Sequence, residues 1–282
     1  MVQVDNERSS RSFHEDFTQK VKIIGEEEED VCGSCISQVY GENAVRLFFK
    51  HPTTASTISR VIVALDPVAS EIISSQPGLK GLEWIGSGMI GNRSFCRIFQ
   101  MKSEGEKLVI AVLLEEQQNA SSSLNNGKGK AQWEFAEAIV SSFVSAESSS
   151  CKVHILSTSN SNSPNTTDNI FQLSSSDSNS YFPVMEAGQM LSGLEACFFS
   201  YCKVRSLDCT VYVCCLEGRL GQQIVSRSLL QALEPLLISL LPFDDDQSMV
   251  DHRRSGFQAA WDRLLSLQDR KNRISSHPPL YL

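Results

Sequence analysis

The sequence predicts an α/β fold, in which helices cover both faces of a central, mostly parallel or mixed sheet in a three-layer domain. Runs with the composition of strands alternate along the chain with segments whose apolar residues recur at helical spacing. One of these runs, residues 60–65, is apolar enough for a strand that is buried on both faces. The chain has 282 residues, 41% of them hydrophobic, and can therefore bury a substantial core.

The two ends of the chain are predicted to lie outside this domain. Residues 1–43 are polar and include the acidic run Glu26 to Asp30, whose like charges repel one another, so we expect a flexible tail. Residues 44–274 are expected to form a single domain, because we find no convincing linker or internal repeat within them. Residues 275–282 follow as an extended C-terminal tail.

The first ordered elements are expected at residues 45–49 and 60–65, which both have strand character. Asp66 and Pro67 come directly after the second of these strands. Because Asp accepts hydrogen bonds from free N–H groups at a helix start and Pro suits the first helical turn, they predict a short helix over residues 68–75.

The next part of the chain predicts a hairpin, a helix and a further strand. Residues 94–101 and 107–114 are two strand-like runs joined by a short polar link that contains a glycine. After a soft segment over residues 117–130, apolar residues recur at helical spacing over 133–144. Residues 151–156 then predict another strand, which includes His154.

Residues 157–180 are predicted to form a mobile surface loop. Seventeen of these 24 residues are Ser, Thr or Asn. Such a composition buries too little apolar surface to offset the entropy lost on ordering.

Four elements are expected after this loop. They are a helix over residues 187–204, a strand over 209–216, a Leu-rich helix over 222–241 and an amphipathic helix over 256–273. Pro235 lies inside the third of these elements and is expected to kink it or divide it in two, because proline lacks the backbone N–H that a helix interior needs.

Two short motifs resemble cofactor or metal sites but lack the context that such sites need. Residues 86–91 match the dinucleotide-binding pattern G-x-G-x-x-G, yet a strand rather than a helix is predicted to follow, which favours an ordinary glycine-rich turn. Cys32 and Cys35 have the spacing of a redox pair, but they follow an acidic run, and the sequence contains no second ligand pair of the kind a zinc site needs. We therefore expect no cofactor and no bound metal.

Composition also bounds the partners and the compartment. The formal net charge of −8 argues against nucleic acid as a partner, and the sequence contains no apolar run of membrane-spanning length. The cysteines that lie among apolar neighbours are expected to be buried, reduced thiols, namely Cys96, Cys197, Cys202, Cys209, Cys214 and Cys215. These features predict a cytoplasmic protein, with the nucleus as a second compartment.

The C-terminal tail carries the most specific functional signal. His277 is followed by two prolines, which stiffen the chain into an extended form, and the sequence then ends on Leu280, Tyr281 and Leu282. This hydrophobic-Tyr-X ending resembles the terminal motif by which proteasome activators and some assembly factors enter pockets between subunits of the proteasome α-ring.

The body of the chain is similar to the family of proteasome assembly chaperone 1. The similarity is clearest over residues 191–204, which read LSGLEACFFSYCKV, and over 211–214, which read VYVC. Weaker similarity lies at residues 61–65, at Gln132 and Trp133, at residues 153–156 and in the helical segment around Leu236. The likeness is patchy and of low identity over residues 45–282, and the Ser-rich loop and the soft segment are particular to this sequence.

The resemblance implies a non-catalytic chaperone for assembly of the 20S proteasome. Such a protein would pair with a second, related chaperone as a heterodimer and would sit on the outer face of the α-ring. By the same resemblance, Leu280 would fill the apolar part of an inter-subunit pocket, Tyr281 would pack at the pocket rim, and the Leu282 carboxylate would meet a pocket lysine.

The alternative is a small α/β hydrolase or nucleotide-using enzyme, since α/β folds host many chemistries. The sequence contains no nucleophile elbow, H-E-x-x-H helix or phosphate-binding loop. The alternative therefore requires a polar pocket that places a carboxylate within hydrogen-bond reach of His154, the one histidine that lies within a predicted strand or helix.

Overall fold

The computed structural model describes thirteen stretches of the chain, all within the unit Ile36–Leu282. They are residues 36–40, 45–50, 58–76, 83–90, 93–102, 108–114, 130–144, 151–160, 170–176, 182–185, 191–217, 224–241 and 256–266. The predicted acidic tail up to residue 35 and the C-terminal tail lie outside these residues. No helix among the described stretches is long and apolar enough to cross a membrane.

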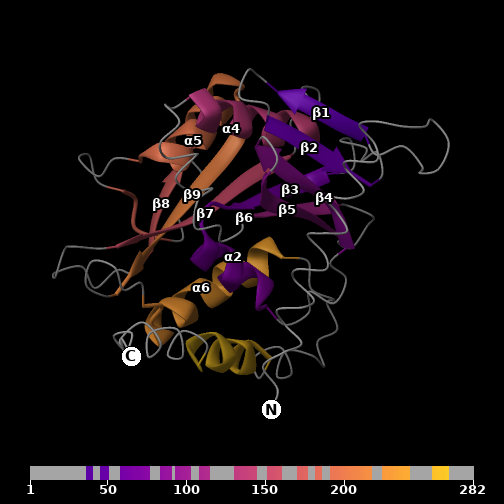
Figure 1. Ribbon diagram of the computed structural model, residues 1–282. Helices are drawn as coiled ribbons and strands as arrows, with labels where there is room; N and C mark the ends of the chain where they lie inside the picture. The colour runs from indigo at the N-terminus through magenta and orange to yellow at the C-terminus, as the bar shows by residue number, and fades with distance from the viewer. Residues whose placement is uncertain are drawn as a thin grey trace, which may run out of the picture. The chain divides into compact units, whose positions relative to one another are not determined.

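Nine strands form one mixed sheet (Figure 1). In chain order they are β1 (Ile36–Tyr40), β2 (Val45–Phe49), β3 (Ile58–Ala64), β4 (Glu83–Ile90), β5 (Arg93–Lys102), β6 (Leu108–Leu114), β7 (Lys152–Asn160), β8 (Ile170–Ser174) and β9 (Asp208–Leu216). Their order in the sheet is β1-β2-β4-β5-β6-β3-β7-β9-β8. The central strands β6, β3, β7 and β9 run parallel, and every other neighbouring pair is antiparallel.

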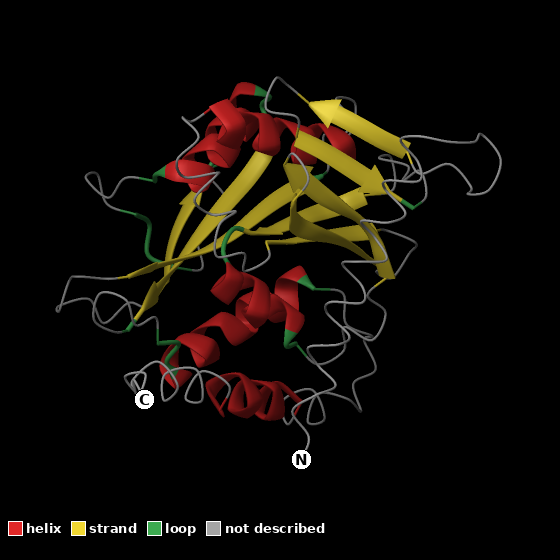
Figure 2. Ribbon diagram, in the orientation of Figure 1, coloured by secondary structure: helices red, strands yellow, loops and turns green. Residues whose placement is uncertain are grey.

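Helices lie on both sides of this sheet (Figure 2). Helices α4 (Lys130–Phe143) and α5 (Gly193–Val204) pack on one face, where Phe135, Phe143 and Phe198 join the first hydrophobic core. Helices α2 (Pro67–Ser74) and α6 (Arg227–Leu240), together with the helix at residues 256–266, pack on the other face around a second core. The predicted three-layer α/β arrangement with a mixed sheet is confirmed.

Two features at the N-terminal side of the sheet differ from the sequence-based expectations. Strand β1 falls inside the segment that was expected to be a flexible tail, where it pairs with β2 from Ile36 opposite Phe49 to Tyr40 opposite Val45. The glycine-rich turn expected at residues 86–91 is wrong, because Gly86 and Gly88 lie within β4. A β-carbon at Gly86 would lie 2.2 Å from the carbonyl oxygen of Phe48, so the glycine allows a close approach of neighbouring strands.

The Ser-rich segment contains ordered strands that its composition conceals. Strand β7 continues to Asn160, and β8 pairs antiparallel with β9 inside the stretch predicted as a loop. Ile170 and Phe171 are buried there. A short edge strand needs only a few apolar residues, so it can form even within a polar segment. Composition averaged over 24 residues does not reveal a strand of five.

Helices α5 and α6 begin later than predicted, whereas the last helix begins at residue 256 as predicted. Gly193 has a φ of +60°, a conformation incompatible with a right-handed helix running through it, and α5 begins at this residue rather than at 187. Helix α6 begins at Arg227 and passes through Pro235 undivided. Because Pro235 has no N–H, the carbonyl of Gln231 lacks its helical hydrogen-bond donor. Both residues are exposed, so water can donate to that carbonyl instead.

Candidate functional site

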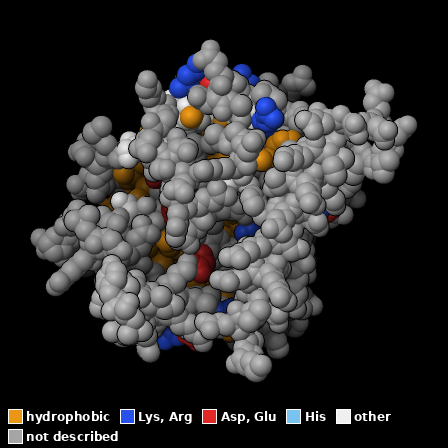
Figure 3. Space-filling view, in the orientation of Figure 1, with side chains coloured by type: hydrophobic (Ala, Val, Ile, Leu, Met, Phe, Trp, Pro, Cys, Tyr) orange, Lys and Arg blue, Asp and Glu red, His pale blue; other side chains and the backbone are white. Residues whose placement is uncertain are grey.

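The carboxyl ends of β3 and β7 form the point in this sheet where α/β proteins commonly bind ligands. After β3 the chain passes into α2 on one face, whereas after β7 it reaches α5 on the opposite face before β9. The chain therefore leaves these two neighbouring parallel strands toward opposite faces of the sheet, which creates a topological switch point. Charged and hydrophobic side chains share a recess between the two helical layers (Figure 3).

Asp66 is the main polar residue at this switch point, and its contacts are structural. One carboxylate oxygen accepts a hydrogen bond from the Ala69 N–H at 2.9 Å, which caps helix α2 as the sequence predicts. The other accepts from the Thr158 N–H on β7 at 2.7 Å. Burial raises the pKa of Asp66, and these hydrogen bonds oppose that shift. The carboxylate thus ties the start of α2 to the neighbouring strand.

Glu195 lies near Asp66, in the first turn of α5. Burial raises the pKa of Glu195 and the charge of Asp66 raises it further, while the backbone N–H of Glu195 lowers it. No three metal-ligating side chains converge anywhere in the described part of the chain. Since Asp66 is held by two backbone donors, the arrangement joins strand ends to helix starts.

His154, which the enzyme alternative requires, lies on β7 in an apolar pocket. The pocket is lined by aliphatic side chains from β3, α2, β7 and α6 together with Tyr212, whose ring stacks on the imidazole at a centroid distance of 6.1 Å. No carboxylate lines this pocket, and Nδ1 of His154 has no hydrogen-bond partner among the residues described. The acid–base pair that the alternative needs is not formed by this part of the chain.

His154 should make the fold sensitive to acid. Burial, aided by the charge of Arg60, lowers the pKa of His154 from 6.5 to about 4, although Asp208 opposes the shift. Below pH about 6.5 His154 is protonated in the unfolded chain but stays neutral in the folded chain. The free energy of unfolding therefore decreases as the pH falls toward about 4. The full effect of this single group is about 3 kcal/mol.

The measurement is urea unfolding of the protein and of His154→Gln at a series of pH values. We expect the unfolding free energy of the wild type to fall, relative to that of His154→Gln, as the pH is lowered from about 6.5 to 4. Parallel pH curves would show that His154 is not the group responsible.

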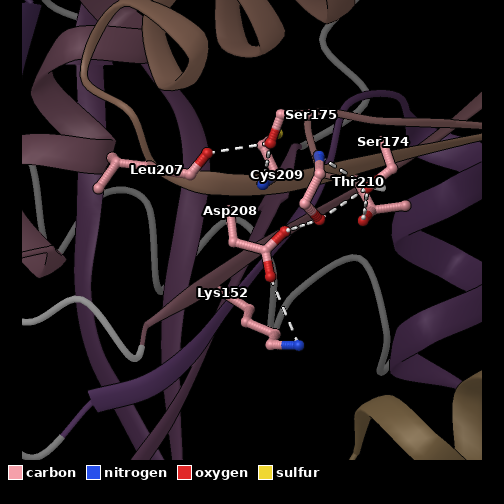
Figure 4. Close-up of polar contacts among 8 residues, drawn as sticks. Lys152, Ser174, Ser175, Leu207, Asp208, Cys209 and Thr210 are labelled. Atoms are coloured by element: carbon pink, nitrogen blue, oxygen red, sulfur yellow. Dashed lines mark hydrogen bonds and ion pairs between the residues drawn. The ribbon is translucent and has the colours of Figure 1, made fainter. Parts of the chain in front are cut away.

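The best-defined polar network joins the end of β8 to the start of β9 (Figure 4). The Ser175 hydroxyl donates to the Leu207 carbonyl at 3.0 Å and accepts from the Cys209 N–H at 2.9 Å. The Ser176 hydroxyl donates to Asp208 at 2.9 Å, and Asp208 also lies 3.4 Å from the Lys152 ammonium. Side chains of the Ser-rich segment thus hold this edge strand in register.

Replacing Ser175 with alanine should weaken this edge. The change leaves a carbonyl and an N–H of a partly buried site without their hydroxyl partner, which costs about 1–3 kcal/mol of unfolding free energy. Ser176→Ala is the matched control, because that hydroxyl is exposed and its loss should change stability by less than about 0.5 kcal/mol. Equal effects of the two substitutions in urea titrations would contradict this account.

None of the seven described cysteines forms a disulfide: Cys96, Cys151, Cys197, Cys202, Cys209, Cys214 and Cys215. Cys96, Cys202, Cys209 and Cys214 are buried as predicted, whereas Cys197 and Cys215 are only half-buried. Burial, together with the charge of Cys202, raises the pKa of Cys151 to about 11, which leaves its thiol protonated and unreactive at neutral pH. Cys32 and Cys35 lie outside the described residues.

The predicted docking residues Leu280, Tyr281 and Leu282 also lie outside the described residues. What sequence reasoning missed is the switch-point contact of Asp66 with Thr158, which are 92 positions apart. The Asp-Pro pair signals the helix start, but no local pattern signals the second acceptor role of this carboxylate.

Comparison with known proteins gives similarity of fold without similarity of sequence. No protein-family profile matches the chain, and no curated protein matches it by sequence. Among solved structures, the archaeal proteasome activator PbaB of Pyrococcus furiosus is similar with a TM-score of 0.55 and 9% identity, over 83% of this chain and 100% of that one. This likeness shows a shared fold.

Two further solved structures overlap less well. PbaA of Pyrococcus furiosus, an archaeal homologue of proteasome-assembly chaperone, has a TM-score of 0.48 and 13% identity, over 84% of this chain and 99% of that one. A proteasome-assembly chaperone homologue of Mycobacterium tuberculosis has a TM-score of 0.43 and 10% identity, over 73% of this chain and 94% of that one.

Proposed function

We propose that this chain is a non-catalytic chaperone for 20S proteasome assembly, which pairs with a second related chaperone and promotes or protects assembly of the α-ring. The observation that carries the proposal is the fold shared with an archaeal proteasome activator over the whole of that protein. The sequence resemblance to proteasome assembly chaperone 1 supports the same role from residue patterns rather than from backbone shape.

In this proposal the C-terminal tail docks into an inter-subunit pocket of the α-ring. Burial of Leu280 and part of Tyr281 would contribute about 3–5 kcal/mol. In this proposal a carboxylate at Leu282 would add about 1.5–3 kcal/mol through a charged hydrogen bond. Ordering three residues costs about 1–2 kcal/mol each. The small remainder implies that the tail needs a second tail or body contacts to bind usefully, as a heterodimer provides.

The test is affinity capture from the native cell extract with identification by mass spectrometry. The full chain is compared with a chain that lacks Leu280, Tyr281 and Leu282, and with Tyr281→Ala, which keeps the length and the carboxylate. We expect the full chain to recover α subunits and one companion chaperone. Both variants should recover the companion chaperone as well as the full chain does. Their recovery of α subunits should be lower by about tenfold or more, because each variant removes a pocket contact.

Each result has a definite meaning. Recovery of α subunits that is unaffected by truncation keeps the chaperone and removes the docking tail. Loss of the companion together with the α subunits places the tail in the heterodimer instead. If no proteasome subunit appears with the full chain, the assembly role is wrong.

A further inference from the structure

The antiparallel half of the sheet has two unlike faces. Val45, Leu47 and Phe49 of β2 point into the first core, beneath α4. Because side chains alternate along a strand, Arg46 and Phe48 point to the opposite face. We call this opposite face of β2, β4 and β5 the basic-aromatic face and define it by Arg46, Phe48, Lys50, Trp84, Arg97 and Phe99.

Strand register places these six side chains in adjoining rows. Phe48 lies opposite Ser87, and Ser87 lies opposite Arg97 on the next strand. Trp84 lies opposite Phe99 in the neighbouring row. Neighbouring strands are about 4.8 Å apart and alternate residues about 6.7 Å apart, so Phe48 and Arg97 flank the buried Ser87 on this face, with Trp84 and Phe99 in the next row.

The helices of this side of the sheet pack on its other half. Helix α2 contacts β3, β6 and β7, and α6 contacts β8 and β9. Phe99 lies at the border of the core that these helices build. Phe48, Trp84 and Phe99 are half-buried, and Figure 3 shows hydrophobic side chains beside Lys or Arg over β2.

The charge of this face is opposite to that of the chain. Arg46, Lys50 and Arg97 are exposed. The ammonium of Lys50 lies 4.0 Å from the centroid of the Trp84 ring, which holds its positive charge against the aromatic surface. A cluster of three cations is a local exception in a chain of net charge −8.

We propose that the basic-aromatic face is an interaction surface for an acidic segment of a partner protein, in which carboxylates meet the three cations and an apolar side chain packs on the aromatic rings. Charge complementarity supplies orientation and association rate, and burial of the aromatic surface supplies affinity. This inference goes beyond the proposed docking tail, because it assigns a contact to the body of the chain.

A protein partner fits this face better than a nucleic acid does. Nucleic-acid grooves align many cations with successive phosphates and leave aromatic rings open for bases to stack. Here Lys50 covers one face of Trp84, so that face of the ring is not open for a base to stack on it.

The experiment measures binding of labelled probes to the full chain by fluorescence anisotropy. The first probe is an acidic peptide in which Glu and Asp alternate with Leu and Phe, and the second has Gln and Asn at the acidic positions. The third is an oligothymidine of the same length. The triple variant R46E/K50E/R97E is compared with K203E/R205E/R263E, which makes the same change of net charge at exposed cations elsewhere.

We expect the acidic peptide to bind more tightly than its neutral analogue and to lose affinity by about tenfold or more in the face variant. The control variant should lose less than about threefold, through long-range charge alone. Circular dichroism checks that both variants fold. Far-UV spectra and thermal melts that match the wild type remove misfolding as the cause of any loss.

Several results would overturn the proposal. These are no detectable binding of the acidic peptide, equal binding of the two peptides, or equal loss in the two variants. Tighter binding of oligothymidine that disappears in the face variant would assign the face to nucleic acid. Self-association of the wild type that the face variant abolishes in sedimentation would assign it to a second copy of the chain.

Discussion

Replacing Phe135 with alanine is expected to lower the free energy of unfolding by about 3–5 kcal/mol, the usual cost of removing a fully buried phenylalanine. Phe135 is 0% exposed on α4 and joins this helix to both of its neighbours. Its ring meets Phe95 of β5 at a centroid distance of 4.7 Å and Phe198 of α5 at 5.5 Å, both edge to face. The substitution therefore removes the centre of the first core.

Urea unfolding followed by circular dichroism measures this effect. Phe199→Ala is the matched control. Phe199 follows Phe198 on α5 and contacts the same core, but its side chain is only half-buried. We expect its loss to cost clearly less than that of Phe135. A similar cost at the two positions would mean that the core is not centred on Phe135.

Gly86→Ala is expected to destabilise the protein by about 2–3 kcal/mol through overpacking. The new methyl group would lie 2.2 Å from the carbonyl oxygen of Phe48, a backbone atom of the paired strand that cannot rotate away. Strands β2 and β4 would have to separate, which disturbs the hydrogen bonds between them.

Gly88→Ala provides an informative comparison. There the added carbon would meet side-chain atoms, Sγ of Cys96 at 2.6 Å and Cζ of Phe95 at 2.9 Å. Truncation of Cys96 to alanine should therefore recover part of the stability lost in Gly88→Ala and none of that lost in Gly86→Ala. Thermal melts of the two double variants test this, and an equal recovery in both would contradict the backbone explanation.

The strands and helices that the sequence predicts well are those with strong local signals. The apolar run of β3 followed by Asp66 and Pro67 specifies both the end of a strand and the cap of α2, because these residues act on backbone groups within three positions. The β5–β6 hairpin has the same local character, with two β-rich runs and a short polar link.

The predictions that are wrong concern segments whose local signal misleads. Gly86 and Gly88 suggest a turn, but both lie within β4, where a β-carbon would meet the backbone of β2 at Gly86 and side chains of β5 at Gly88. Ile170, Phe171 and Leu173 are too few to mark a strand within a Ser-rich segment, and they become one only by pairing with β9. In both cases the deciding atoms belong to a distant strand.

At the candidate sites, the sequence predicts the residue types and the local elements that carry them, including Asp66 at a helix start and His154 on a strand. Their surroundings depend on the packing of distant segments. The tertiary structure places Thr158 against Asp66, an apolar pocket around His154, and three cations on one sheet face. Local backbone preferences are encoded by neighbours in the chain, whereas burial, charge environment and strand register depend on residues that folding alone brings together.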